Sequence, residues 1–215
     1  MPKDTLRITE IFYSLQGEGK TVGLPTTFIR LTGCPLRCGY CDTEYAFHGG
    51  ETRSIDEIMQ EVGKLGAHYI NVTGGEPLAQ KRVHDLMKTL CDTGYHVSLE
   101  TSGALDVSDV DERVIKVVDV KTPASGEVDK NCHENYSYLT QQDQVKYVIC
   151  DRADFQWSKE HMQEHRLDDK CEVLFSPVQG ELQATDLANW ILSDKLPVRF
   201  QIQLHKYLWG DEPGK

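Results

Sequence analysis

The sequence predicts an α/β protein built mainly of parallel β-α-β units. Two observations carry this prediction: short runs rich in β-branched residues recur along the chain, and segments with helical periodicity lie between several of them. The chain has 215 residues. This length suits one domain with a substantial core and is too short for two full-sized domains, so we expect a single domain spanning residues 1–215.

Seven apolar runs are expected to form buried strands. They cover residues 26–31, 69–73, 96–100, 114–120, 144–150, 172–176 and 199–204. Three helices are expected, at residues 54–65 and 80–94 and from residue 184 to just before Pro197. The first begins with a capping box formed by Ser54 and Glu57, and the second ends at Gly94, a residue type that often stops a helix. The polar stretch 122–143 is expected to form a long loop.

Polar and reactive residues follow the expected strands. Cys34 comes after the first strand, Glu76 lies just after the second, and Lys121 follows the fourth. In parallel α/β sheets, ligands bind at the carboxyl ends of the strands. We therefore expect the chemistry of this protein to converge on one face of the fold.

Three cysteines, Cys34, Cys38 and Cys41, are spaced C-x3-C-x2-C in a stretch that also contains proline and glycine. Such a stretch favours a loop that wraps around a ligand. Three thiolates are one short of a closed zinc site, but they leave an iron–sulfur cluster with one open iron. The spacing leaves two alternatives open, which are zinc with a remote fourth ligand, such as Cys132 or a histidine, and three unrelated thiols.

Composition excludes several classes of function. The formal net charge is −11, which argues against a nucleic-acid-binding surface and against binding to an anionic membrane. No apolar run approaches the ~18 residues of a transmembrane helix, and the N-terminus lacks the pattern of a signal peptide. An odd number of cysteines, 7, argues against a disulfide framework. We therefore expect a cytoplasmic protein without membrane or nucleic-acid partners.

A second motif, TGGEP at residues 73–77, follows the expected strand 69–73. Together with the cysteine motif it resembles the radical S-adenosylmethionine (SAM) superfamily. The resemblance implies a partial, modified TIM-like barrel with a (β6/α3)-like core. It also implies a [4Fe-4S] cluster held by Cys34, Cys38 and Cys41, with the amino and carboxylate groups of SAM on the open iron.

The resemblance narrows when five motifs are taken together. SLQGEG, FIRLTGCPLRCGYCDT, TGGEP, LETSG and QLHKYLWG resemble the 7-carboxy-7-deazaguanine synthase family from about Ile8 to the C-terminus. The family implies a lyase that converts 6-carboxy-5,6,7,8-tetrahydropterin to 7-carboxy-7-deazaguanine, with ring contraction and loss of ammonia, in queuosine and 7-deazapurine biosynthesis. The agent of hydrogen abstraction is the 5′-deoxyadenosyl radical, so no side chain is assigned as a catalytic acid or base.

The resemblance also implies site residues. The substrate contacts map onto Leu15, Gln16, Gly17, Glu18, Arg30 and Thr73. The SAM contacts map onto Tyr40, Cys41, Asp42, Gly75, Glu100, Asp119, Val120, Lys121, Ser176, Pro177, Val178 and Gln179. Thr43 is the implied Mg²⁺ ligand, although Asp42 or Thr43 capping the next turn is the alternative. Arg30 suits a substrate carboxylate, and His205 is a further candidate for the pocket.

The family resemblance further implies a homodimer and an electron donor such as a flavodoxin or ferredoxin. The tail WGDEPGK after H-K-Y-L departs from some family members, and it either folds over the pocket or extends away. Two other functions stay open. One is a radical SAM activating enzyme for a glycyl-radical protein, and the other is a non-enzymatic zinc-binding module.

Overall fold

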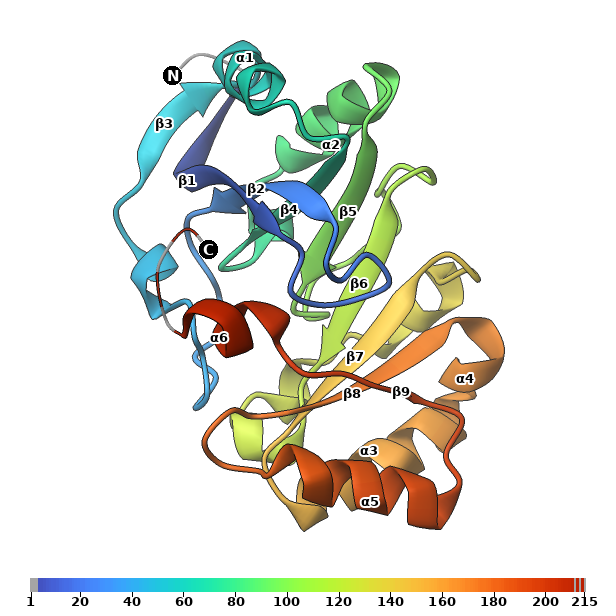
Figure 1. The fold of residues 1–215 in the computed structure, drawn as a ribbon. Coiled ribbons are helices and arrows are strands. Elements are labelled where there is room, and N and C mark those ends of the chain that lie inside the picture. Colours follow the sequence, from blue (N-terminus) through green and yellow to red (C-terminus); the bar gives the residue numbers. More distant parts are fainter. Residues whose placement is uncertain (1–3, 211, 213, 215) are drawn as a thin grey trace.

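The computed structural model of this chain describes residues 4–210, 212 and 214. These residues form one nine-stranded sheet in the order β3-β1-β2-β4-β5-β6-β7-β8-β9 (Figure 1). The strands are β1 (Thr5–Leu15), β2 (Pro25–Leu31), β3 (Glu51–Ser54), β4 (Tyr69–Gly74), β5 (His96–Thr101), β6 (Ile115–Val120), β7 (Gln144–Ile149), β8 (Glu172–Pro177) and β9 (Arg199–Phe200). β1 runs antiparallel to β2 and β3, and all other neighbours are parallel.

The helices lie between the strands. The α-helices are α1 (Ile55–Leu65), α2 (Val83–Asp92), α3 (Arg152–His165), α4 (Leu167–Lys170), α5 (Ala184–Asp194) and α6 (Leu204–Trp209). The 3-10 helices are η1 (Glu44–Phe47), η2 (Pro77–Ala79), η3 (Pro123–Ser125), η4 (Val128–Lys130) and η5 (His133–Tyr138). No helix in the described part of the chain has both the length and the apolar character needed to cross a membrane.

The seven strands expected from the sequence are the seven parallel strands of the sheet. The last of them is shorter than expected, because pairing with β8 stops at Phe200 and the chain then turns into α6. The Gln201 side chain instead accepts a hydrogen bond from the Gly19 backbone at 2.9 Å. The capping box of α1 is confirmed, with Ser54 and Glu57 bonding each other's backbone N–H.

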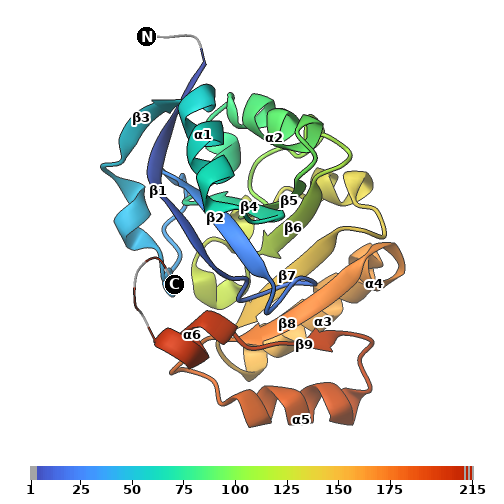
Figure 2. The same ribbon diagram turned by 45° about the horizontal axis from the view of Figure 1, so that its top comes forward.

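The sheet is strongly twisted and forms an open, partial barrel (Figure 2). The turn between β1 and β2 reaches across the sheet to the start of β7, where the Lys20 backbone N–H donates to Gln144 Oε1 at 2.7 Å. The helical shell is incomplete, since the described residues between β5 and β6 and between β6 and β7 contain no α-helix. The predicted partial barrel is confirmed.

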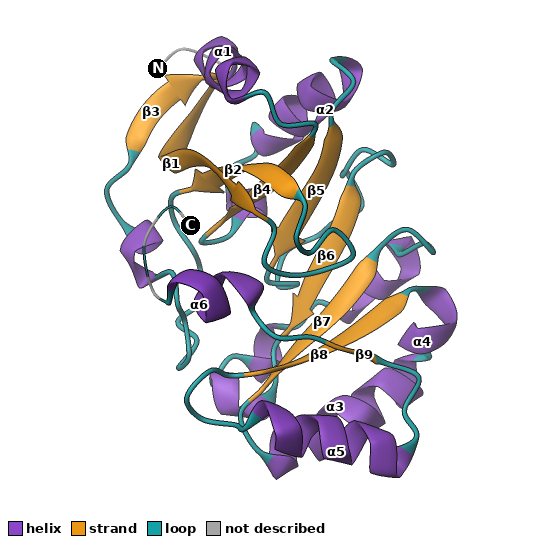
Figure 3. Cartoon of the chain, in the orientation of Figure 1, coloured by secondary structure: helices purple, strands orange, loops and turns teal. Residues whose placement is uncertain are grey.

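Two apolar cores fill the space between the sheet and the helices, which are orange and purple in Figure 3. The first joins α1 and α2 to β2, β4 and β5, with Ile29, Val72 and Leu86 fully buried. The second joins α3 and α5 to β7 and β8, with Phe155 and Phe175 fully buried. Burial of each such side chain stabilises the folded state by about 1.5–3 kcal/mol. The opposite face of the sheet stays free of these cores and carries the site.

Candidate active site

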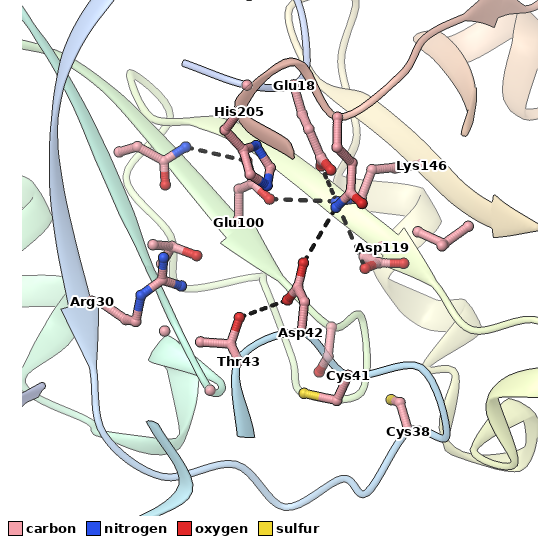
Figure 4. Close-up of a pocket in the computed structure, with 18 of the residues that line it drawn as sticks. Glu18, Arg30, Cys38, Cys41, Asp42, Thr43, Glu100, Asp119, Lys146 and His205 are labelled. Carbon is pink, nitrogen blue, oxygen red and sulfur yellow. Dashed lines mark hydrogen bonds and ion pairs between the residues drawn. The ribbon is translucent and has the colours of Figure 1, made fainter. Parts of the chain in front are cut away.

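One face of the parallel strands carries a row of polar side chains. Arg30 of β2 pairs in register with Thr73 of β4, and Asp119 of β6 pairs with Lys146 of β7. Residues paired in register project their side chains to the same face of a sheet. Glu100 of β5 also lines this face, so five neighbouring strands each place at least one polar group there. Figure 4 shows Arg30, Glu100, Asp119 and Lys146.

This face forms the floor of a cavity with an empty volume of about 1320 Å³, including space open to solvent. Most of the residues predicted from the sequence line it. They are Leu15, Gln16, Gly17, Glu18, Arg30, Cys34, Cys38, Tyr40, Cys41, Asp42, Thr43, Thr73, Gly75, Glu100, Asp119, Lys121, Val178 and Gln179.

The cysteine loop forms one wall of the cavity. Cys34, Cys38 and Cys41 are free thiols, each partly buried. The backbone N–H of Leu36 donates to Cys34 Sγ at 3.4 Å, a contact that stabilises negative charge on sulfur. Burial raises the pKa of Cys38 to about 11 and also raises the pKa of each of the other two thiols, so a bound cation is needed to hold them as thiolates at pH 7.

The glycine run after β4 passes directly beneath this loop. The Gly75 backbone N–H donates to Leu31 O at 3.2 Å, and the Glu76 N–H donates to Gly33 O at 2.8 Å. A Cβ on Gly75 would overlap the Gly33 carbonyl and lie 2.9 Å from Cys34 Cβ. Gly75 is therefore required by the close approach of two backbones at the base of the cysteine loop.

Glu76 braces the carboxyl ends of β4 and β5 instead of facing a ligand. Its fully buried carboxylate accepts hydrogen bonds from the Thr101 hydroxyl, from the hydroxyl and backbone N–H of Ser102, and from the Leu78 N–H. A buried carboxylate is stable when donors surround it in this way. The motif places a carboxylate beside two glycines, and the hydrogen bonds show that its role is structural.

Lys146 stands at the centre of the cavity floor, and sequence reasoning missed it. Its ammonium contacts Glu18 Oε2 and lies 3.5 Å from Glu100 Oε2 and 3.8 Å from Asp119 Oδ2. Although burial opposes the charge, these three carboxylates hold the pKa of Lys146 well above its usual value. Burial raises the pKa of Glu100, whereas Lys146 holds the pKa of Glu18 below its usual value. The sequence feature that could have identified Lys146 is a single lysine within an expected apolar strand.

The guanidinium group of Arg30 is held through Nε, whereas its two terminal nitrogens are available. Its Nε donates to Glu10 Oε1 at 2.7 Å, and the Tyr45 hydroxyl donates to the same oxygen at 2.8 Å. The guanidinium also lies 5.8 Å from the Phe12 ring centroid. Within the described residues, its two terminal nitrogens have no hydrogen-bond partner, so they are available to a ligand in the cavity.

Asp42 and Thr43 lie at the mouth of the cavity. The Thr43 hydroxyl donates to Asp42 Oδ1 at 2.7 Å, and Lys206 Nζ lies 3.5 Å from Asp42 Oδ2. Although burial opposes ionisation, the Thr43 hydrogen bond and the Lys206 charge lower the pKa of Asp42 to about 2. Because the Thr43 O–H already donates its hydrogen bond to Asp42, the oxygen lone pairs are left for another partner.

The Q-G-E-G and H-K-Y-L motifs meet across the cavity. The Leu204 backbone N–H donates to Gly17 O at 3.0 Å, and a Cβ on Gly17 would overlap the His205 ring. Gln16 Oε1 accepts from the Gly17 N–H at 2.9 Å, which fixes the turn. Helix α6 therefore covers the cavity, and His205 lines it as expected. Residues 211, 213 and 215 of the tail lie outside the described residues, so its two predicted alternatives stay predictions.

Three residues predicted to contact SAM are not part of the cavity lining. Val120 packs into the second apolar core, on the other face of β6. Ser176 and Pro177 are buried at the end of β8, and the cavity wall continues instead with Val178 and Gln179. Strand alternation explains the outcome for Val120, because its neighbours Asp119 and Lys121 take the inner side.

The comparisons with known proteins agree with this site. The family model of the radical SAM superfamily matches residues 28–121, which contain both the cysteine motif and the glycine turn. A curated 7-carboxy-7-deazaguanine synthase of Chlorobaculum tepidum is 44% identical, with 96% of each chain covered. The synthase of Koribacter versatilis is 45% identical, with 96% of this chain and 98% of the relative covered.

A solved structure, QueE from Escherichia coli, matches with a TM-score of 0.78 and 22% identity, covering 94% of this chain and 95% of that one. At that identity the likeness shows the fold alone. The class of protein follows from the family model, since residues 28–121 with the cysteine loop match the radical SAM superfamily. The full-length relatives narrow this further, and the chain belongs to the 7-carboxy-7-deazaguanine synthase family.

Proposed function

We propose that this protein converts 6-carboxy-5,6,7,8-tetrahydropterin to 7-carboxy-7-deazaguanine as a radical SAM lyase. The observation that carries the proposal is Arg30, whose terminal nitrogens face the cavity without a partner in the described residues. A guanidinium held at Nε presents a fixed pair of donors, which matches a carboxylate. The pyrimidine edge of a pterin would then lie toward Gln16 and Glu18, which offer both donors and acceptors.

The cysteine loop fits a [4Fe-4S] cluster. Cys34, Cys38 and Cys41 are free and line one cavity, and residues 34–43 contain no fourth cysteine and no histidine. Three thiolates leave one iron open for SAM, and the cluster and SAM together supply the one-electron chemistry that removes a hydrogen atom from the substrate. The chain supplies the thiolates, the orientation of both ligands and the exclusion of water.

The floor beyond the cysteine loop fits SAM. Asp119 Oδ1 is buried without a hydrogen-bond partner in the described residues, although the residue lines the cavity. Its other oxygen pairs with Lys121 at 3.0 Å, so the carboxylate is fixed in place with one free acceptor. Glu100 and Asp119 would accept hydrogen bonds from ribose hydroxyls, and Tyr40 would pack beside the adenine.

Thr43 is proposed as the protein ligand of Mg²⁺. Its hydroxyl oxygen lines the cavity, and its O–H already donates a hydrogen bond to Asp42. Magnesium prefers oxygen ligands and keeps several positions for water and substrate, so a single hydroxyl suits it. Asp42 would hold Thr43 in orientation from outside the coordination shell, and the substrate carboxylate would complete the site.

We further infer that residues 1–215 form one catalytic domain, since one sheet joins β3 to β9. The electron donor, a flavodoxin or ferredoxin, the homodimer and the cytoplasmic location stay predictions from the family resemblance and the composition.

The proposal is tested by a binding cycle on the substrate carboxylate. Cluster-loaded protein with SAM is titrated anaerobically with 6-carboxypterin and with pterin that lacks the carboxylate. Arg30→Gln should weaken binding of 6-carboxypterin by about 10–100-fold, the value of a charged hydrogen-bond pair. Binding of unsubstituted pterin should change little. The control Lys159→Met alters a surface ion pair far from the cavity and should change neither affinity.

Two results would contradict the proposal. One is an equal loss for both pterins in Arg30→Gln, because Arg30 would then not read the carboxylate. The other is the absence of binding by either pterin to the wild-type protein.

A further inference from the structure

Three histidines outside the cavity converge between η5 and α3. His161 and His165 are four residues apart on α3, so they project from the same helix face. His133 begins η5, on the opposite side of this junction. One potential ligand nitrogen from each ring lies within 4.8 Å of the other two. The rings are close to one another, with centroids 4.5 Å apart for His161 and His165 and 4.7 Å for His133 and His165.

The environments of His161 and His165 favour their neutral form. Burial and the neighbouring imidazoles lower the pKa of His161 to about 3, and burial together with His133 lowers the pKa of His165. Both are therefore neutral at pH 7, the form of imidazole that binds a metal. Within the described residues, no carboxylate forms an ion pair with any of the three rings.

His161 is oriented by a buried partner. Its Nδ1 lies 2.8 Å from the hydroxyl of Tyr147, a fully buried residue of β7. When Nδ1–H donates to that hydroxyl, Nε2 carries the lone pair, and it now lies 3.3 Å from the Tyr136 hydroxyl. A metal-binding histidine commonly donates its other ring N–H in this way, which fixes both its tautomer and its direction.

We propose that His133, His161 and His165 bind a divalent transition-metal ion, with Zn²⁺ the best chemical fit. Imidazole ligands suit zinc, copper and nickel, whereas Mg²⁺ and Ca²⁺ prefer oxygen. Zinc bonded to nitrogen at ~2.0–2.1 Å in a tetrahedral site separates the ligand atoms by roughly 3.4 Å. His133 and His165 therefore need only to rotate toward His161, whose direction Tyr147 fixes, and a water molecule takes the fourth position.

The ion would stabilise the stretch of chain that ends in η5, which contacts the cysteine loop. The stretch that ends in η5 also supplies Asn131, whose Oδ1 accepts from the Lys121 N–H at 2.8 Å, and Glu127, whose carboxylate accepts from the Arg37 N–H at 2.6 Å. An ion joining η5 to α3 would fix one end of this stretch. The site is separate from the cavity, and it does not depend on the proposed reaction.

The test uses the cluster-loaded protein, so that Cys34, Cys38 and Cys41 are occupied. The protein is equilibrated anaerobically with Zn²⁺, and its zinc content, zinc affinity and zinc-edge X-ray absorption are measured. We expect one Zn²⁺ per chain, with imidazole nitrogen and no sulfur in its coordination shell. His133→Gln and His165→Gln should each weaken binding at least about tenfold, since loss of a residue that only orients a metal ligand already costs about 10–100-fold in affinity.

His96→Gln is the matched control, since His96 packs against His68 with ring centroids 4.5 Å apart but has no third imidazole among the described residues. Zinc should also raise the melting temperature of the wild-type protein and of His96→Gln, and should not raise that of His165→Gln. The proposal is overturned if the protein retains no zinc, if zinc is bound through sulfur, or if His165→Gln binds zinc as tightly as the wild type. In those cases the three rings serve aromatic packing alone.

Discussion

Lys146 shows how one buried residue sets the electrostatics of the site. Three carboxylates, from the turn after β1 and from β5 and β6, surround its ammonium. Sequence reasoning located Glu18, Glu100 and Asp119 through the family resemblance, yet it overlooked their common cation. A single lysine in QVKYVIC does not reveal its partners, because register across several strands decides which side chains meet.

Lys146→Met should destabilise the protein by about 3–5 kcal/mol at neutral pH, since it leaves buried carboxylates without a counter-charge. Without the ammonium, the pKa values of these carboxyls in the folded state rise above their unfolded values. The folded state then binds more protons than the unfolded state, so the deficit should shrink as the pH falls toward about 5. Urea denaturation of the two proteins at both pH values measures this.

Lys159→Met is the control, because Lys159 forms a partly exposed pair with Asp194 at 2.7 Å. Loss of this ion pair should lower the free energy of unfolding by about 0–1 kcal/mol. A deficit in Lys146→Met that is absent at neutral pH, or that grows on acidification, would contradict this account of the cavity floor.

Among the elements, sequence patterns located the parallel strands better than the rest. Runs such as those of β4 and β8 are apolar on both faces or nearly so, which makes them visible without knowledge of their neighbours. β1 is a mixed strand at the antiparallel side of the sheet, and α3 carries many polar residues and few apolar ones. Neither has a strong period, so tertiary packing decides their structure.

At the junction of β2 and β4, Gly75→Ala should lower the iron content obtained by anaerobic reconstitution. The added methyl group would push against the Gly33 carbonyl and Cys34 Cβ, and would displace the base of the cysteine loop. Overpacking of this kind costs about 1–3 kcal/mol, measurable by urea denaturation.

Gly63→Ala provides the contrast, because Gly63 lies in α1 and no described atom beyond its own helix backbone stands within 4 Å of the place that the added methyl group would take. This change should leave the iron content intact and stabilise the helix by about 0.5–1 kcal/mol. Full iron loading of Gly75→Ala would show that the close backbone approach is not needed.

Over the whole molecule, segments from the two ends of the chain close the cavity together. The turn after β1 and the start of α6 are joined through Gly17 and Leu204, and Gly19 is joined to Gln201. The motifs in these two segments distinguish the family from the rest of the superfamily. They offered no physical reason for the pairing of the segments, because a contact between opposite ends of a chain leaves no local pattern.

This closure predicts a coupling between Gly17 and His205. Gly17→Ala should destabilise the protein, since its Cβ would overlap the imidazole ring. In a His205→Ala background the same change should cost less, with a coupling of about 0.5–3 kcal/mol in a double-mutant cycle measured by urea denaturation. Additive effects of the two substitutions would contradict the packing of α6 over the turn.

The most direct test of the proposed reaction is anaerobic turnover. Reconstituted protein is given SAM, dithionite, Mg²⁺ and 6-carboxy-5,6,7,8-tetrahydropterin, and the products are read by mass spectrometry, with Cys38→Ala alongside. We predict that the wild-type protein forms 7-carboxy-7-deazaguanine and that Cys38→Ala does not. A cluster-loaded wild-type protein that cleaves SAM but leaves the pterin intact would contradict the proposed substrate.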